Sequence, residues 1–105
     1  MSNFDSKFGS RLNLIYAMHA EPAIAVDKYD AAINADCSVI LEFELKRYAL
    51  AGIDISGAAA VISIRVSELP KRPFKDHKFR VLGKTYHVEE VFQADGTEYK
   101  MTVTT

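Results

Sequence analysis

The chain has 105 residues, of which 49% are hydrophobic and 26% are charged, and its formal net charge is −1. This length fits one domain, and the composition of an ordinary globular domain excludes a chain that is disordered throughout. A net charge near zero argues against a strongly basic nucleic-acid-binding domain. No apolar run approaches the roughly 18 residues of a membrane span.

The first predicted element is an amphipathic helix over residues 4–19, within a helical N-terminus of residues 1–20. Ser2 or Asn3 can cap its start, and Pro22 follows its end. Helical spacing relates Phe4, Phe8, Leu12, Ile15, Tyr16 and His19. We expect this apolar stripe to cover one end of the core, with docking of part of it on a partner as the alternative. The apolar stretch 14–18 is too short for a secretory signal.

Beyond Pro22 the hydrophobic period changes to two, which predicts β-strands. Alternation is clear at 24–26, 39–46, 62–66, 78–81, 86–89 and 99–104. Gly83 and Gly96 mark short hairpin turns. The step from Val88 to Val91 breaks the alternation and predicts a β-bulge at Glu89–Glu90. The fold class is therefore mainly β: a short N-terminal helix followed by an antiparallel β-sandwich or small barrel of about six to seven strands.

One segment fits neither period. Residues 47–60, RYALAGIDISGAAA, combine two glycines and three successive alanines with a few large apolar side chains. Two readings stay open: a long hairpin whose strands continue into this segment, or a loop with a function of its own. We predict a mobile insertion loop over residues 46–60 within a single domain of residues 1–105.

The sequence contains no recognisable catalytic or cofactor chemistry. No phosphate-binding glycine motif occurs, and the three histidines have no metal-ligand spacing with one another or with Cys37. Glu89 and Glu90 are neighbours on a strand, which makes them a poor acid–base pair. We therefore predict a protein that is not an enzyme and has no metal or cofactor. The single cysteine, Cys37, cannot form an internal disulfide, favours a reducing compartment and is expected to be buried.

Positive charge is concentrated in residues 71–80, which hold five Lys or Arg residues and one Asp. Their net charge is +4, so the rest of the chain carries −5. Basic residues interleaved with Phe74 and Phe79 are typical of nucleic-acid-binding surfaces, and equally of the solvated face of an ordinary strand. Phe79 alternates in step with Val81 and is expected to face the core. Phe74 is then the one aromatic side chain of this segment free to stack on a base.

The order of elements in the second half of the chain resembles that of the lambda-like phage head–tail joining proteins, a family of small neck proteins. The resemblance rests on Val66-Ser67-Glu68-Leu69-Pro70, on the hairpin around Leu82-Gly83-Lys84, and on Asp95-Gly96 before the closing strand. The opening Ser2-Asn3-Phe4-Asp5 is also similar. Residues 28–60 resemble the family only in the spacing of their predicted strands. Lys75-Asp76-His77 stands where many members have Gly-Asp, which leaves the geometry of that turn open.

The resemblance implies a structural virion protein with a tail-tube-like β-domain. Its partners would be identical copies in a ring, hexameric by family resemblance, together with a head-completion or portal-side protein and a tail terminator or tail-tube protein. It implies assembly in the cytoplasm of a bacterial host and a final place in the virion neck, with no membrane and at most non-specific contact with passing DNA. Our candidate interface residues are Phe4, Phe8, Tyr48, Leu50, Ile53, Ile55, Lys71, Arg72, Lys75 and Lys78.

Two alternative functions stay open. The first is a small β-barrel that binds nucleic acid through the basic segment. The second is another phage neck role, such as tail terminator or head closure, because these proteins share the β-domain architecture.

Overall fold

The computed structural model describes residues 3–105, with their side chains from residue 11 onward. Helix α1 (Asn3–His19) is followed by six strands: β1 (Glu21–Val26), β2 (Ala32–Glu42), β3 (Ala60–Arg65), β4 (Lys78–Val81), β5 (Lys84–Ala94) and β6 (Glu98–Thr104). A short helix α2 (Lys46–Leu50) lies between β2 and β3, and one 3-10 turn η1 (Val66–Glu68) follows β3. The predicted N-terminal helix and the number of strands are therefore confirmed.

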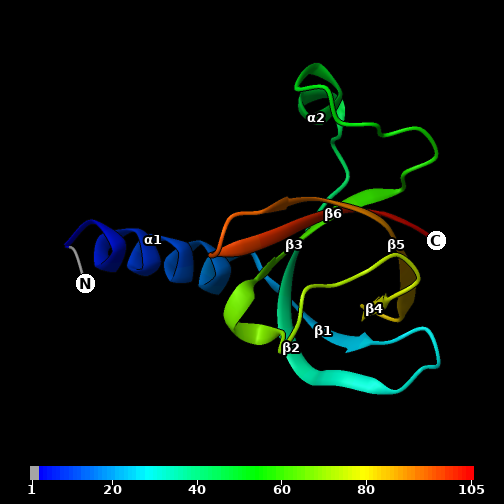
Figure 1. Ribbon diagram of the computed structural model, residues 1–105, viewed down its shortest axis with the longest axis horizontal. Helices are drawn as coiled ribbons and strands as arrows, with labels where there is room; N and C mark the ends of the chain where they lie inside the picture. Colours follow the sequence, from blue (N-terminus) through cyan, green and yellow to red (C-terminus); the bar gives the residue numbers. More distant parts are fainter. Residues whose placement is uncertain (1–2) are drawn as a thin grey trace.

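The six strands close into a barrel in the order β1-β2-β3-β6-β5-β4, with every pair antiparallel (Figure 1). Closure occurs where β4 pairs with β1, with Ala25 opposite Phe79 and Ala23 opposite Val81. Of the two predicted architectures, sandwich or small barrel, the structure adopts the barrel.

Side chains fill the interior of the barrel. Inward-facing residues alternate along each strand, as the period of two predicts. Phe79, Ile62, Met101 and Val39 are each at most 1% exposed. Because these large side chains meet at the centre, the barrel contains a packed core, as small barrels of this kind do.

Strand β2 differs from its predicted extent. It begins at Ala32 and ends at Glu42, whereas the sequence predicted a strand running to residue 46 with Phe43 and Leu45 on the buried face. That prediction was wrong, since Phe43 is 64% exposed. Pairing with β3 stops at Glu42 opposite Val61, and the chain leaves the barrel there. The alternation of apolar and polar residues in the sequence continues beyond Glu42, which is the last residue of β2 with a partner on β3.

The predicted irregularities of the hairpins are present. The register between β5 and β6 shifts between Val88 and Glu90, which confirms the bulge. The β4–β5 turn is formed by Leu82 and Gly83, with φ of 52° and 80°. Positive φ at both positions belongs to the type I′ turn that matches the twist of a hairpin.

Two elements project from the barrel. Figure 1 shows α1 extending away from it, with its C-terminal end nearest the strands, and α2 standing out beyond the end of β2. The insertion between β2 and β3 covers residues 43–59, close to the predicted 46–60, and contains a helical turn that the sequence did not predict. None of the helices in residues 3–105 is long and apolar enough to cross a membrane.

Asp95 turns the chain between β5 and β6. Its carboxylate accepts hydrogen bonds from the backbone N–H of Glu98 at 3.0 Å and from the hydroxyl of Thr97 at 2.7 Å. These bonds, that of Glu98 first, lower the pKa of Asp95 from 3.8 to about 2. The charged carboxylate therefore stabilises the folded state above its unfolded pKa, and this contribution is lost as the pH falls through the folded pKa.

We expect Asp95→Asn to reduce the acid sensitivity of the protein, because the amide oxygen still accepts hydrogen bonds and does not titrate. Urea unfolding at pH 4, 3 and 2 checks this. The unfolding free energy of the native protein should fall more steeply over this interval than that of the variant. Equal slopes would show that the turn contributes nothing to acid unfolding.

Candidate functional site

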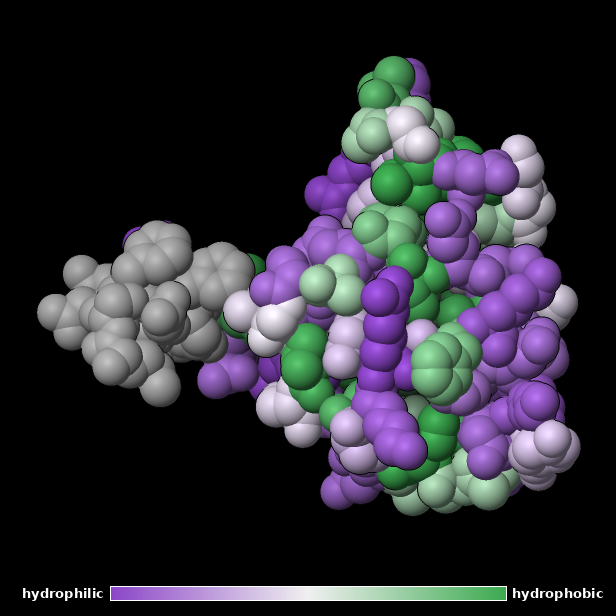
Figure 2. Space-filling view, viewed as in Figure 1, coloured by the Kyte–Doolittle hydropathy of each residue, from purple (hydrophilic) through white to green (hydrophobic). Residues whose placement is uncertain are grey.

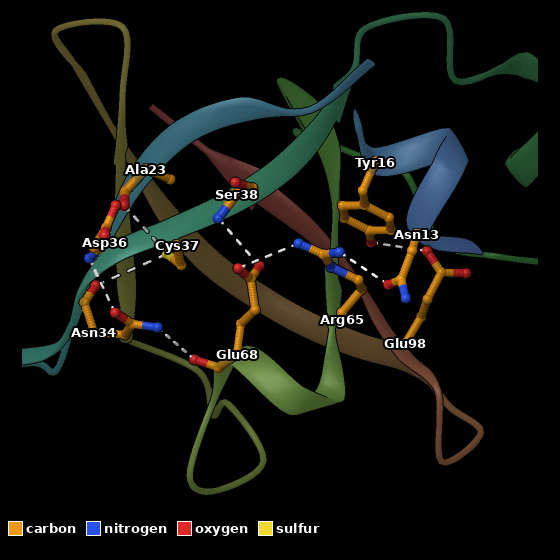
Figure 3. Close-up of polar contacts among 10 residues, drawn as sticks. All are labelled: Asn13, Tyr16, Ala23, Asn34, Asp36, Cys37, Ser38, Arg65, Glu68 and Glu98. Atoms are coloured by element: carbon orange, nitrogen blue, oxygen red, sulfur yellow. Dashed lines mark hydrogen bonds and ion pairs between the residues drawn. The ribbon is translucent and has the colours of Figure 1, made fainter. Parts of the chain in front are cut away.

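Arg65, at the end of β3, joins α1 to the barrel (Figure 3). Its guanidinium carbon lies 4.7 Å from the centre of the Tyr16 ring. One terminal nitrogen donates to the side-chain oxygen of Asn13 at 3.0 Å, and the other lies 3.4 Å from a carboxylate oxygen of Glu68. A single side chain therefore connects α1, β3 and η1.

Tyr16, which lies on α1, also anchors the helix to the barrel. It is 2% exposed, and its hydroxyl donates to the carboxylate of Glu98 on β6 at 2.8 Å. Burial, followed by the nearby carboxylate, raises the pKa of Tyr16. The phenol therefore stays protonated and keeps donating at neutral pH. Tyr16 and Arg65 hold the C-terminal part of α1 on the barrel and leave the rest of the helix projecting.

Glu68 connects the same junction to β2. Its second carboxylate oxygen accepts a hydrogen bond from the backbone N–H of Ser38 at 3.1 Å, and its backbone carbonyl accepts one from the amide of Asn34 at 2.7 Å. Strand β2 pairs with β3 only from Val39 onward, so its earlier residues lack a strand on that side. Glu68 supplies partners for this otherwise open edge.

The insertion is tied to the barrel by a similar group of side chains. Tyr48 is 8% exposed, its hydroxyl donates to Glu42 at 2.7 Å, and its ring packs against Phe92 with the ring centres 5.5 Å apart. Arg47 lies over the Tyr48 ring at 4.8 Å and forms an ion pair with Glu42. Both projecting elements are therefore attached by a tyrosine bonded to a strand glutamate, with an arginine over its ring.

These arrangements give the predicted residues of the insertion different roles. Tyr48 packs against Phe92 and bonds Glu42 within the chain. Leu50 is 80% exposed and lies at the end of α2, whereas Ile53 and Ile55 are half-buried. Figure 2 shows hydrophobic surface at the tip of the α2 projection. Leu50 is therefore the member of this group that is free for a partner.

Exposed apolar side chains also lie on the described part of α1. Leu14, Ile15 and Met18 are 60%, 47% and 68% exposed. The predicted contact residues Phe4 and Phe8 belong to the same helix, but their side chains lie outside the described residues. The expectation that the helix covers one end of the core holds for Tyr16, whereas Leu12 is half-buried and Leu14, Ile15 and Met18 stay exposed.

The basic segment separates into two groups. Lys71, Arg72 and Lys75 are exposed on the loop before β4. Lys78, predicted to share that role, is instead in an ion pair with Asp30 at 2.9 Å, and Arg80 lies 3.3 Å from the same carboxylate. Asp30 is a residue for which the sequence suggested no structural partner, because 48 residues separate it from Lys78.

The loop that carries the three free cations is held on the barrel. Pro73 is buried, and the backbone N–H of His77 donates to the carbonyl of Phe74, while its carbonyl accepts from the N–H of Val88. Phe74 is 59% exposed, whereas Phe79 is 1% exposed, as its parity predicted. Glu89 and Glu90 line the same shallow groove as Arg72 and Lys75. This surface therefore carries both signs of charge around one exposed aromatic ring.

Among the side chains that the structure describes, from residue 11 onward, no group of three or more His, Cys, Asp or Glu is placed to hold a metal ion. Cys37 is 2% exposed, as predicted, and burial raises the pKa of its thiol to about 11. A protonated, buried thiol is a poor nucleophile.

Comparison with known proteins identifies no relative: no family model, no curated protein and no solved structure matches this chain.

The sequence did not reveal the junction around Arg65, because its partners Asn13 and Tyr16 are 52 and 49 residues away along the chain. The one local signal is the spacing of Arg65 and Glu68, which is three residues. Such a spacing is common on any helical turn and does not distinguish a junction from an ordinary surface pair.

We expect Tyr16→Phe and Glu98→Gln to be coupled. Each should lower the unfolding free energy by about 1 kcal/mol, because the bond joins a neutral donor to a charged acceptor in a partly buried place. A double-mutant cycle measured by urea unfolding should give a coupling energy of roughly 0.5–1.5 kcal/mol. Strict additivity would mean that the helix is held by apolar packing alone.

Proposed function

We propose that this chain is a structural subunit of a phage neck, which joins the DNA-filled head to the tail as one copy in a ring of identical subunits. The proposal starts from the resemblance of both ends of the chain to head–tail joining proteins. The observation that carries it further is the pair of projecting, partly apolar elements on a barrel whose interior is already filled.

Because side chains fill the interior of the barrel, the proposed function uses its outer surface. Ligand-binding barrels keep a cavity, but here residues such as Phe79 and Met101 occupy the centre. The outer surface, in contrast, exposes Leu50 on α2 and Met18 on α1. Exposed apolar groups gathered on projecting elements are typical of protein–protein contacts. An assembly subunit needs such contacts and needs no reaction site.

The distribution of charge also fits an assembly subunit. Lys71, Arg72 and Lys75 lie on one loop, while the rest of the chain has an excess of carboxylates. In a heterologous ring, one face of a subunit contacts a different face of its neighbour, so a polarised surface favours head-to-tail order. Tail terminators and head-closure proteins share this requirement, and the similarity of the N-terminus to joining proteins is what favours the joining role.

Leu50→Glu is expected to abolish joining and leave the fold intact. The side chain is 80% exposed, so a charge there should change the unfolding free energy by less than about 0.5 kcal/mol. The measurement mixes the purified variant with filled heads and separated tails and counts joined particles by electron microscopy. Leu82→Glu is the matched control, because Leu82 is 71% exposed on the β4–β5 turn. Normal joining by Leu50→Glu would remove the insertion from the interface.

Nucleic-acid binding is a second candidate because one surface observation favours it. Lys71, Arg72 and Lys75 flank Phe74 in the sequence and all four are exposed, a combination of cations and a stacking ring that is typical of single-stranded nucleic-acid binding. The carboxylates of Glu89 and Glu90 in the same groove oppose phosphate binding, so this candidate ranks below the neck role.

For this second candidate, fluorescence anisotropy with single- and double-stranded DNA at about 50 mM salt should show binding that weakens steeply as salt is added. Changing Lys71, Arg72 and Lys75 together to Ala should weaken it at every sequence tested. The control changes Lys84 to Ala, which removes one exposed cation outside the loop. No measurable affinity at the lowest salt would eliminate nucleic-acid binding as the function.

A further inference from the structure

We propose that His77 is a pH-sensitive latch on the loop before β4. Its neutral imidazole holds residues 74–77 in a closed turn, and protonation of the ring releases that turn. The latch lies in the surface around Phe74, and its action does not depend on the neck role.

Residues 74–77 form a four-residue turn that leads into β4. The backbone N–H of His77 donates to the carbonyl of Phe74 at 3.1 Å. Asp76, the third residue of the turn, has a φ of 77°, in the left-handed region that most residues with a Cβ avoid. A turn that includes such a residue depends on the bonds around it to keep its shape.

The ring of His77 supplies one of those bonds. The backbone N–H of Phe74 donates to its Nδ1 at 3.2 Å, and the two rings pack with their centres 5.1 Å apart. Because a backbone N–H can only donate, Nδ1 must carry a free lone pair in the closed turn. An imidazolium has a proton on both nitrogens and cannot accept this bond. Protonation of His77 and closure of the turn by its ring therefore exclude each other.

Both burial and charge act on the ring. His77 is half-buried, and this burial lowers the pKa of its imidazole from the ordinary 6.5. The carboxylates of Asp27, which follows β1, and of Asp76 oppose this lowering. Lys78, the next residue in the chain, is paired with Asp30. The net effect is a pKa below 6.5, which places protonation on the acidic side of neutrality.

The closed turn has its full stability above pH 6.5, where the imidazole is neutral in both the closed and the released loop. As the pH falls below 6.5 toward the lowered pKa, the released loop takes up the proton first, because its ring is in water. The stability of the closed turn is lost over this interval.

Release changes what covers β5. Strand β4 pairs with β5 only as far as Lys78 opposite His87. Beyond that pair, the carbonyl of His77 accepts from the N–H of Val88 at 2.8 Å, and the N–H of Asp76 donates to the carbonyl of Val88 at 3.2 Å. The turn thus continues the pairing that β4 begins.

The shallow groove beside this pairing has the loop on one side and Glu89 and Glu90 of β5 on the other. Phe74 and Lys75 lie on the loop side, and both are exposed. Pro73, in contrast, is buried and fixes the loop just before the turn. Release of the latch therefore frees Phe74 and Lys75 from their place beside the carboxylates of β5 and leaves the start of the loop where it is.

NMR titration of the isotope-labelled full chain from about pH 8 to about pH 4.5 tests the latch. The Hε1 signal of His77 should titrate below pH 6.5, and the amide signal of Phe74 should shift with the same midpoint. The hydrogen-exchange protection of the Phe74 amide, corrected for the pH dependence of exchange itself, should fall by roughly two- to tenfold, as loss of one hydrogen bond implies. The amide of Ile62, which is 0% exposed in the core, should keep its protection, because the barrel stays folded.

Two variants assign the response to the ring. His77→Asn keeps an oxygen acceptor one bond beyond Cγ, where the imidazole has Nδ1, and it does not titrate. Its Phe74 amide should stay protected over the whole pH range. His19→Asn makes the same substitution at an exposed site on α1 and should respond to pH as the native protein does.

Three results would each overturn the latch and leave the neck role untouched. A His77 ring that titrates at or above pH 6.5 would mean that the closed turn does not oppose protonation. Constant protection of the Phe74 amide while the ring titrates would mean that the bond to Nδ1 does not hold the loop. A pH response that persists in His77→Asn would assign the change to another group.

Discussion

The architecture depends on the pairing of β4 with β1, which closes the barrel. Ala23 and Ala25 face Val81 and Phe79 across this seam. The small alanines let a short strand approach closely and leave room for the Phe79 ring at the centre. Closure pairs every strand with two neighbours and leaves only short unpaired stretches, such as the start of β2.

The two projecting elements share one mode of attachment. Tyr16 donates to Glu98 on β6, and Tyr48 donates to Glu42 on β2. A guanidinium lies over each ring, at 4.7 Å and 4.8 Å. Each element is thus held by a buried aromatic ring with a polar tip that reaches a strand carboxylate. In the proposed function, this attachment holds exposed side chains such as Leu14 and Leu50 in place before a partner binds, which lowers the entropy lost on binding.

Tertiary contacts also determine which charges on the barrel stay unpaired. The sequence concentrates cations in residues 71–80, but Asp30 lies against Lys78 and Arg80 and neutralises part of that segment. The positive charge that remains free lies on the loop of Lys71, Arg72 and Lys75. The basic patch is therefore smaller than the sequence suggests.

The sequence alone determined the helix, the strands, the β5 bulge and the inward parity of Phe79, because hydrophobic periodicity and turn residues are local signals. It also identified the insertion as distinct from the strands. Only the tertiary structure decided that the sheet closes, that β2 ends before Phe43, that Tyr48 turns inward while Leu50 stays exposed, and that Arg65 joins α1 to the barrel. These outcomes depend on which distant residues meet, and no periodicity within a segment encodes a partner that lies tens of residues away.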